Sequence, residues 1–250
     1  MAIRASSSGI IKLGVIEAPV KLFIAASPER VKFSNVTPDG NPLSQKYIDP
    51  ETGAEVKMSD CDKSFSDDVY GDVFFTKEEV KQFSSPTKNG NVLVEEFVPL
   101  RSIDMVNVEK SYYLKPAKGG AEQFRLLANA MLKSKKVAVA TWTNGGKELM
   151  ALVRPYRGGM ILHQLFFSNE VRDYEDNIPD VDIAEENAKL AEQLIEEMSS
   201  KTFNPNKYHD KYAERVAKAA KAKATGQTVT SDDEDLDMIS ALTASLQSRS

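Results

Sequence analysis

The run Lys136-Val-Ala-Val-Ala-Thr-Trp-Thr143 leads into Asn144-Gly145, and Glu148-Leu-Met-Ala-Leu-Val-Arg154 follows. Asn-Gly between two apolar runs favours a type I′ turn, whose twist matches that of two paired strands. After the turn residues 155–159, a third run, Met160-Ile-Leu-His-Gln-Leu-Phe-Phe167, completes the pattern. Three such runs in succession predict an antiparallel meander, which is typical of β-barrels and sandwiches.

The remaining segments predict a mainly β fold class with additional helices. Apolar residues that alternate along the chain predict strands, and apolar residues that recur on one helical face predict helices. The expected strands are 11–15, 20–24 after Pro19, 92–97 and 111–116. The expected helices are 76–83, 121–132, one capped by Asp182 and Glu185 that ends near Ser199, and one opened by Pro205 that ends near Lys223.

Residues 27–72 form a long polar stretch between two predicted strands. The stretch carries Pro28, Pro38, Pro42 and Pro50 and has little periodicity. Segments of this kind inside a domain are usually either disordered or functional. Composition alone leaves both interpretations open.

The composition predicts a cytoplasmic protein that has no membrane partner. Of its 250 residues, 41% are hydrophobic, which suits a real core. No window approaches the ~18 apolar residues of a membrane helix, and residues 1–9 lack the apolar region of a signal peptide. Cys61 is the single cysteine, so the chain fits a reducing compartment and lacks the ligands of a zinc site.

The net charge of −5 is unevenly distributed, because charges of one sign cluster in separate segments of the chain. Residues 101–172 carry +7 and residues 201–225 carry +5, whereas residues 173–200 carry −9. Basic residues near strand ends project beyond a sheet and can grip a sugar-phosphate backbone whatever the bases are. The alternative is an ordinary solvated surface, to which the acidic total charge would be suited.

No motif predicts catalysis or a cofactor. The chain lacks a Walker A loop, a dinucleotide fingerprint, His-Glu-x-x-His and Gly-x-Ser-x-Gly. His163 lies in an apolar run, where a satisfied structural histidine is expected. The cluster Lys207-Tyr-His-Asp210 could position a proton shuttle, but no nucleophile accompanies it. We therefore expect a protein that is not an enzyme.

The last residues suggest a partner-binding segment. Leu236, Ile239, Leu242 and Leu246 recur at helical spacing after an acidic linker. Such an amphipathic segment can dock into the groove of a partner, or it can fold back on its own domain.

Taken together and in order, these motifs resemble the prokaryotic Ku family. Each motif is weak alone, but the collinear set runs over essentially the whole chain. The matching segments are Ile3-Arg4, Gly9-Ile-Ile-Lys-Leu-Gly14, Ala18-Pro-Val-Lys-Leu-Phe23, Ser111-Tyr-Tyr-Leu-Lys-Pro116, Leu149-Met-Ala-Leu-Val-Arg154, Phe203-Asn-Pro-Asn-Lys-Tyr-His-Asp-Lys-Tyr212 and Asp235-Leu-Asp-Met-Ile-Ser-Ala-Leu-Thr-Ala-Ser-Leu246. The chain departs from many relatives in lacking a Cys-x-x-Cys pair at residues 47–53, which removes a metal site, and in lacking a long lysine-rich tail.

The resemblance implies a Ku-core β-barrel at residues 1–172 whose insertion, at about 27–72, arches over DNA. It further implies a helical C-terminal arm at 173–224, an acidic linker at 225–235 and a short terminal segment at 236–250. Two copies would form a ring-shaped homodimer that threads onto double-stranded DNA ends in non-homologous end joining. The ring would recruit an ATP-dependent ligase of the bacterial ligase D type, through Leu236, Ile239, Leu242 and Leu246. The residues expected to contact phosphates are Arg30, Lys32, Lys46, Lys135, Lys136, Lys147 and Arg157.

Two rival interpretations remain at this stage. A β-barrel module could bind protein rather than DNA, as the acidic total charge would allow. An enzyme could use the cluster at residues 207–210. Binding to open duplex ends but not to circles separates the end-binding interpretation from both rivals.

Overall fold

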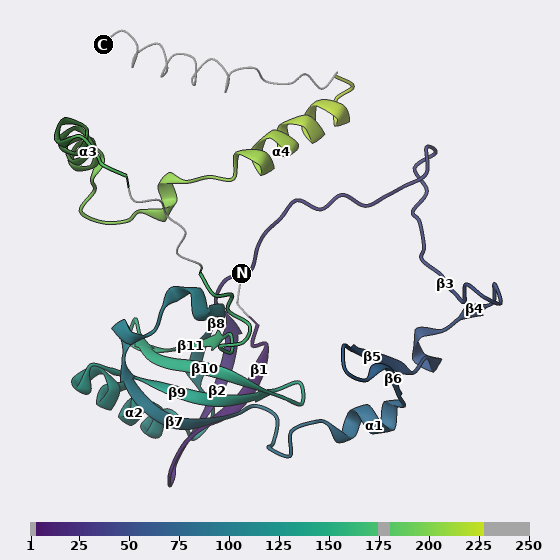
Figure 1. The fold of residues 1–250 in the computed structure, drawn as a ribbon, viewed down its shortest axis with the longest axis horizontal. Coiled ribbons are helices and arrows are strands. Elements are labelled where there is room, and N and C mark those ends of the chain that lie inside the picture. Colours follow the sequence, from purple (N-terminus) through teal and green to yellow (C-terminus); the bar gives the residue numbers. More distant parts are fainter. Residues whose placement is uncertain (1–3, 175–180, 228–250) are drawn as a thin grey trace. The chain divides into compact units, whose positions relative to one another are not determined.

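A computed structural model describes residues 4–174 and 181–227. Seven strands close into a barrel in the order β1-β2-β8-β11-β10-β9-β7 (Figure 1). Neighbouring strands are antiparallel, except that β1 and β7 close the barrel as a parallel pair. The predicted mainly β fold class is thus confirmed. The strand bounds are β1 Ser7–Leu13, β2 Ile16–Ile24, β7 Asn91–Pro99, β8 Val108–Pro116, β9 Lys136–Asn144, β10 Lys147–Tyr156 and β11 Gly159–Leu165.

The predicted meander is present as β9, β10 and β11, with one correction to its first turn. Asn144 pairs with Lys147, so the central turn residues are Gly145 and Gly146 rather than Asn144 and Gly145. Both glycines have positive φ, at 61° and 78°. A type I′ turn needs positive φ at both central positions, and Gly-Gly meets this need without a Cβ at either position.

The core fills the barrel with side chains of contrasting size. Trp142 is fully buried and meets Tyr112 edge to face at 5.1 Å between ring centroids. Small residues surround this large ring, because Ala138, Ala140 and Ala151 point into the same cluster. Close packing requires such a match of volumes, and enlarging one of these alanines would force neighbouring side chains out of their rotamers.

A second apolar cluster lies on the outside of β9, β10 and β11. Val137, Leu152 and Leu165 form it, and partly buried residues such as Ile103 cover it. The cover comes from the connection between β7 and β8, which contains two short 3-10 turns, Leu100–Ser102 and Met105–Asn107. These strands are therefore buried on both faces, which explains why their sequences are continuously apolar rather than alternating.

Helix α2, Ala121–Ser134, packs against the barrel and confirms the predicted helix. Its buried face consists of Phe124, Leu127 and Met131, which join the barrel core. Lys135 follows in a left-handed conformation with φ of 54° and ends the helix. The chain consequently enters β9 at the next residue.

The insertion between β2 and β7 comprises residues 25–90, and we call it the arm. Little regular structure was predicted for residues 27–72, yet the arm contains two small hairpins, whereas its helix confirms the one predicted at residues 76–83. Asp49 and Asp67 accept backbone N–H groups in the two hairpin turns, at 2.9 and 2.8 Å, and thereby replace an apolar driving force. The bounds are β3 Tyr47–Ile48, β4 Glu55–Val56, β5 Lys63–Asp67, β6 Gly71–Phe75 and α1 Lys77–Gln82, with a 3-10 turn at Met58–Asp60.

The predicted capping box of α1 is confirmed. The Thr76 hydroxyl accepts the Glu79 N–H at 3.3 Å, and the Glu79 carboxylate accepts the Thr76 N–H at 2.8 Å. The Thr76 N–H, and secondly the Thr76 hydroxyl, donate to the Glu79 carboxylate and lower the pKa of Glu79, because they favour its charged form.

Among residues 181–227, two helices follow the barrel, α3 Glu185–Met198 and α4 Lys211–Ala224. The predicted cap at Asp182 is wrong, because Ala184 occupies the N-cap of α3 and provides no side-chain acceptor. The predicted start at Pro205 is also wrong. Pro205 opens only a 3-10 turn, Pro205–Lys207, and α4 begins later because Asp210 caps it through the Ala213 N–H at 3.0 Å.

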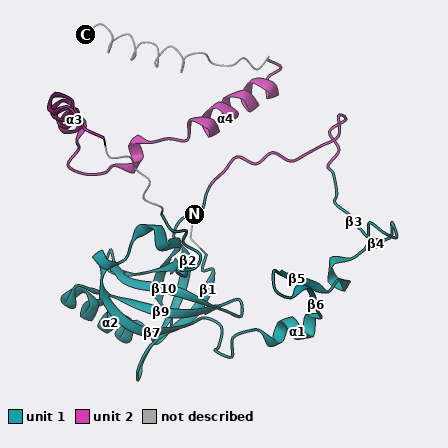
Figure 2. Ribbon diagram, in the orientation of Figure 1, with its two compact units in different colours: residues 1–28, 43–176 teal, residues 29–42, 177–250 magenta. Residues whose placement is uncertain are grey.

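The chain divides into two compact units (Figure 2). The first comprises residues 1–28 and 43–176 and contains the barrel; the second comprises residues 29–42 and 177–250. Within residues 4–174 and 181–227, no helix combines the length and apolarity needed to cross a membrane.

Candidate nucleic-acid interface

Both ends of the arm are fixed to the barrel by hydrogen bonds. At the departing end, the Ala25 N–H donates to the Ser111 carbonyl oxygen at 2.9 Å. At the returning end, the Ser85 N–H donates to the Gly146 carbonyl oxygen at 2.8 Å, and the Asn89 side-chain oxygen accepts the Gly145 N–H at 2.8 Å. We call this returning end, residues 84–90 with the β9–β10 turn, the arm foot. The arm is thus a closed excursion from the barrel rather than a free tail.

Lys147 lies in the arm foot, at the first position of β10. Its side chain is exposed, as is that of Lys88 on the arm side of the same junction. The sequence predicted Lys147 as a phosphate ligand from its place beside a hairpin tip. Lys88 was not predicted, because hydrogen bonds and strand pairing between residues far apart in the chain bring the two segments together.

Lys135 and Lys136 lie at the far end of the same hairpin from Lys147. Lys136 begins β9 and the turn follows Asn144, so the two ends are roughly 26 Å apart at about 3.3 Å per residue. Phosphates follow one another every ~3.4 Å of axis along each DNA strand, so this distance corresponds to about eight base pairs. Both ends could contact one duplex only if the duplex runs along the hairpin.

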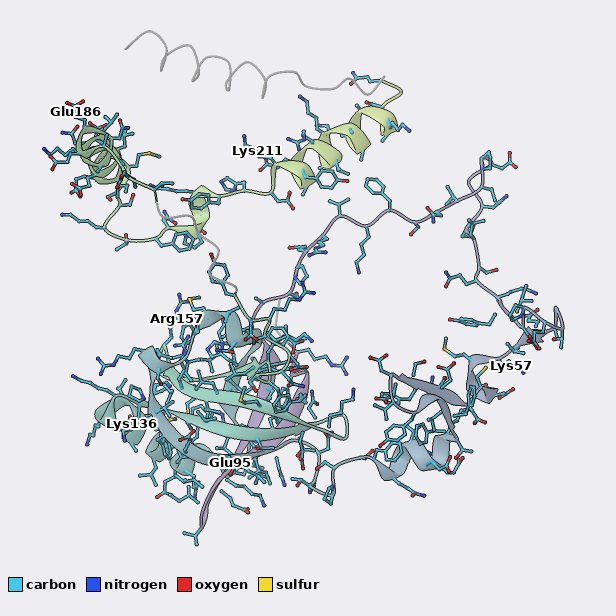
Figure 3. The ribbon with its side chains drawn as sticks, viewed as in Figure 1. Lys57, Glu95, Lys136, Arg157, Glu186 and Lys211 are labelled. Carbon is cyan, nitrogen blue, oxygen red and sulfur yellow. The ribbon has the colours of Figure 1, made fainter. Side chains whose placement is uncertain are left out.

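Arg157 lies apart from Lys136 on the barrel (Figure 3). It follows β10 in a left-handed conformation with φ of 45°, and its guanidinium carbon lies 5.2 Å from the centre of the Tyr156 ring. Arg154 lies at the same distance from that ring. Tyr156 therefore organises two guanidinium groups at the β10–β11 turn.

The remaining predicted residues belong to the arm. Arg30 and Lys32 are exposed and fall in the second unit. Lys46 forms a salt bridge with Glu55 at 2.7 Å across the β3–β4 hairpin. An exposed pair of this kind is weak and can open, but its carboxylate reduces the local positive charge. This pairing was not predicted, because it depends on the hairpin register.

His163 is a satisfied structural residue, as predicted. Arg154 Nε donates to His163 Nε2 at 3.0 Å, so Nε2 is the acceptor and the Nδ1 proton is directed to Ser111 Oγ at 2.7 Å. Burial lowers the pKa of His163, and the Arg154 charge lowers it further. The neutral ring thus holds Arg154 in place beside Tyr156.

Two further predicted sites were the cluster at residues 207–210 and the partner-binding segment near the C-terminus. In the cluster at 207–210, the Asp210 carboxylate is engaged in capping α4. No group of three His, Cys, Asp or Glu side chains suited to a metal occurs among residues 4–174 and 181–227. The predicted partner-binding residues Leu236, Ile239, Leu242 and Leu246 lie outside the described residues.

Comparison with known proteins gives a consistent match. A family model described as the Ku70/Ku80 beta-barrel domain matches residues 12–197. A protein of Paraburkholderia phymatum named non-homologous end joining protein Ku is 34% identical over 258 residues, covering 99% of this chain and 84% of that protein. A protein of the same name from Coxiella burnetii is 30% identical, over 94% of this chain and 88% of its own length. Another from Archaeoglobus fulgidus is 28% identical, over 98% of this chain and 98% of its own length.

Proposed function

The chain belongs to the Ku family, and from this premise we propose that it binds the ends of double-stranded DNA in non-homologous end joining. The relatives it resembles carry that role in their names. Binding is independent of sequence, because the candidate ligands are lysine and arginine side chains suited to phosphates rather than to base edges. The protein acts without catalysis, in the cytoplasm.

The observation that carries this proposal is the arm, which is hydrogen-bonded to the barrel at both ends. A closed excursion can surround a duplex once a second copy completes the ring, whereas a free tail cannot. The duplex can then enter the ring only at one of its free ends. Lys147 and Lys88 contact phosphates at the arm foot, and Arg30, Lys32 and Lys46 contact them from the arm. Lys135, Lys136 and Arg157 extend the contact along the barrel.

Exposed apolar side chains support the second copy. Tyr70 is 80% exposed and Phe74 73% exposed on the arm, and Met198 is 83% exposed on α3. Single exposed apolar side chains are common on soluble proteins, so these three support an interface only through a second copy that gathers them into one. A homodimer would cover them, and light scattering should then give twice the chain mass of 27.6 kDa.

The terminal residues 236–250 recruit the ligase in this proposal. Leu236, Ile239, Leu242 and Leu246 form one apolar stripe if the segment is helical, and such a stripe suits a groove on a partner. Deleting residues 236–250 should abolish stimulation of an ATP-dependent ligase of the ligase D type but leave DNA binding intact. Unchanged stimulation would show that another surface recruits the ligase.

Band-shift assays with three DNA forms test the proposed function. A linear duplex, the same duplex with both ends closed by hairpins, and a relaxed circle present identical phosphates but different access. We expect binding to the open linear form, weak binding to the hairpin-closed form, and little binding to the circle. Equal binding to all three would indicate an open groove, and binding to none would favour a protein-interaction module.

A further inference from the structure

A pocket of about 840 Å³ lies on the barrel beside the first turn of α2, well away from the arm foot. Tyr156 on its wall and Lys147 in the arm foot occupy opposite ends of the ten-residue strand β10, roughly 30 Å apart. The pocket is lined by buried core residues such as Leu114 and Met160 and by aromatic and basic side chains. Its volume falls in the range of small-molecule sites.

Four aromatic rings line the pocket, Phe124 from α2 and three others from three different strands. Phe23 of β2 lies directly opposite Tyr113 of β8, and Tyr113 stacks on Tyr156 of β10 with 5.8 Å between centroids and 18° between planes. Strand alternation places these rings outward, since Leu22 and Leu114 beside them are buried in the core. The rings therefore form a half-buried platform, and a flat group that stacks on it would displace the cations that lie over Phe23 and Tyr156.

Basic side chains surround the rings. Lys115 Nζ lies 5.1 Å from the centre of the Phe23 ring, Arg157 lies over Tyr156, and Arg125 enters from α2. Glu122 is the one acidic residue in the lining. Within the described residues, none of these three cations forms a salt bridge with a carboxylate. The pocket thus carries a net positive charge, with three cations against one carboxylate.

The register adds a second sign that an anion is expected. Lys115 lies directly opposite Lys21 across β2 and β8, and both side chains are exposed. Like charges in directly paired positions destabilise a sheet. An anionic group bound between the two lysines would remove this repulsion.

We propose that this pocket binds a nucleotide, with the base stacked on the aromatic platform and the phosphates held by the surrounding cations. Aromatic stacking together with basic side chains is how proteins hold unpaired nucleotides without reading their sequence. A base inside a duplex cannot offer its face to the rings, because its neighbours cover it. The ligand is therefore either a free nucleotide or the unpaired nucleotide of a single-stranded overhang. The site does not depend on the proposed end binding.

The test measures binding of AMP, ATP, single-stranded dT8 and inorganic pyrophosphate to the full chain by titration calorimetry, without duplex DNA. One variant, Tyr156→Ala, removes the centre of the platform. A second, Lys115→Gln with Arg125→Gln, changes only exposed side chains and guards against misfolding, which thermal unfolding monitors. Lys12→Gln is the matched control, because Lys12 is paired with Glu17 on the same barrel and does not line the pocket.

We expect binding of a nucleotide ligand that both pocket variants weaken about tenfold or more and that the control leaves unchanged. Binding of AMP or ATP identifies the free nucleotide as the source, and binding of dT8 alone identifies the overhang. The proposal is overturned if none of these ligands binds. It is equally overturned if pyrophosphate binds as tightly as ATP and dT8, because the platform would then contribute nothing.

Discussion

Lys147 and Lys136 are exposed lysines at opposite ends of one hairpin. Changing the charge of each in turn shows whether a bound duplex runs along the hairpin. Each phosphate contact releases about one counterion, so each lost contact lowers the salt dependence of binding by about one unit of slope. We predict that Lys147→Glu weakens binding to every duplex sequence alike and lowers the slope by about one. Fluorescence anisotropy at several salt concentrations measures both quantities.

Lys136→Glu distinguishes two directions of the duplex. If the duplex runs along the hairpin, this variant lowers the slope as Lys147→Glu does; if it runs across the arm foot, the slope stays. Lys189→Glu on α3 makes the same charge change at a position outside the candidate interface, and it should leave the slope unchanged. An unchanged slope for Lys147→Glu itself would exclude the arm foot from the DNA contact.

The buried neutral ring of His163 makes the stability of the barrel depend on pH. Its folded pKa is lowered, mainly by burial and also by Arg154, so the unfolded chain binds a proton more readily than the folded chain. The resulting stability is complete above the ordinary histidine pKa near 6.5 and is lost as the pH falls below it. Melting temperatures between pH 8 and pH 5 should therefore fall more steeply in the wild type than in His163→Gln. The control His209→Gln, at an exposed position in the second unit, should keep the steep fall, and equal slopes in wild type and His163→Gln would contradict this account.

At the scale of elements, the closure of the barrel depends on one close approach. β1 and β7 pair in parallel, and a Cβ on Gly9 would overlap the carbonyl oxygen of Gly90. We predict that Gly9→Ala destabilises the protein by roughly 3 kcal/mol, because backbone rather than a flexible side chain occupies the space. Urea unfolding followed by Trp142 fluorescence measures the change.

Gly145→Asn serves as the control for Gly9→Ala. Gly145 also has a constrained backbone, with φ of 61°, but open space surrounds it. Asparagine tolerates this conformation, so the cost should stay within about 1 kcal/mol. Equal costs for the two variants would mean that the β1–β7 contact is looser than described.

The arm foot is a second element whose stability can be measured locally. Asn89→Ala removes the acceptor of the Gly145 N–H, a bond between residues 56 positions apart. A net hydrogen-bond contribution of about 1 kcal/mol corresponds to roughly fivefold faster exchange of the Gly145 amide hydrogen. As a control, Asn129→Ala on the exposed surface of α2 should leave the exchange rate of the Gly145 amide unchanged. An unchanged rate in Asn89→Ala as well would show that Asn89 does not anchor the arm foot.

Local patterns predicted the barrel strands and α2 well, because the spacing of apolar residues within each segment indicates the element. The Asp182 cap and the Pro205 helix start failed, since several polar residues compete for each helix end and the sequence does not rank them. The arm hairpins were missed because side-chain acceptors such as Asp49, rather than apolar alternation, define them. Lys88, Lys21 and the Lys46–Glu55 pair were missed because only strand register and long-range hydrogen bonds place their partners.

At the scale of the whole molecule, the proposed ring around DNA consists of a closed barrel, an arm attached at both ends and a second copy of the chain. Such a ring binds by topology as well as by charge. Charge contacts weaken steeply with salt, whereas a threaded ring stays on any DNA that lacks an exit. Salt resistance on closed DNA therefore separates threading from surface binding.

The most direct measurement loads the protein on a linear plasmid, ligates the plasmid into a circle, and washes the complex with high salt. The account predicts that protein remains on the ligated circles, leaves when a restriction enzyme reopens them, and is washed from circles to which it was added after ligation. Threading would be contradicted if high salt removed the protein from the ligated circles as readily as from circles to which it was added after ligation.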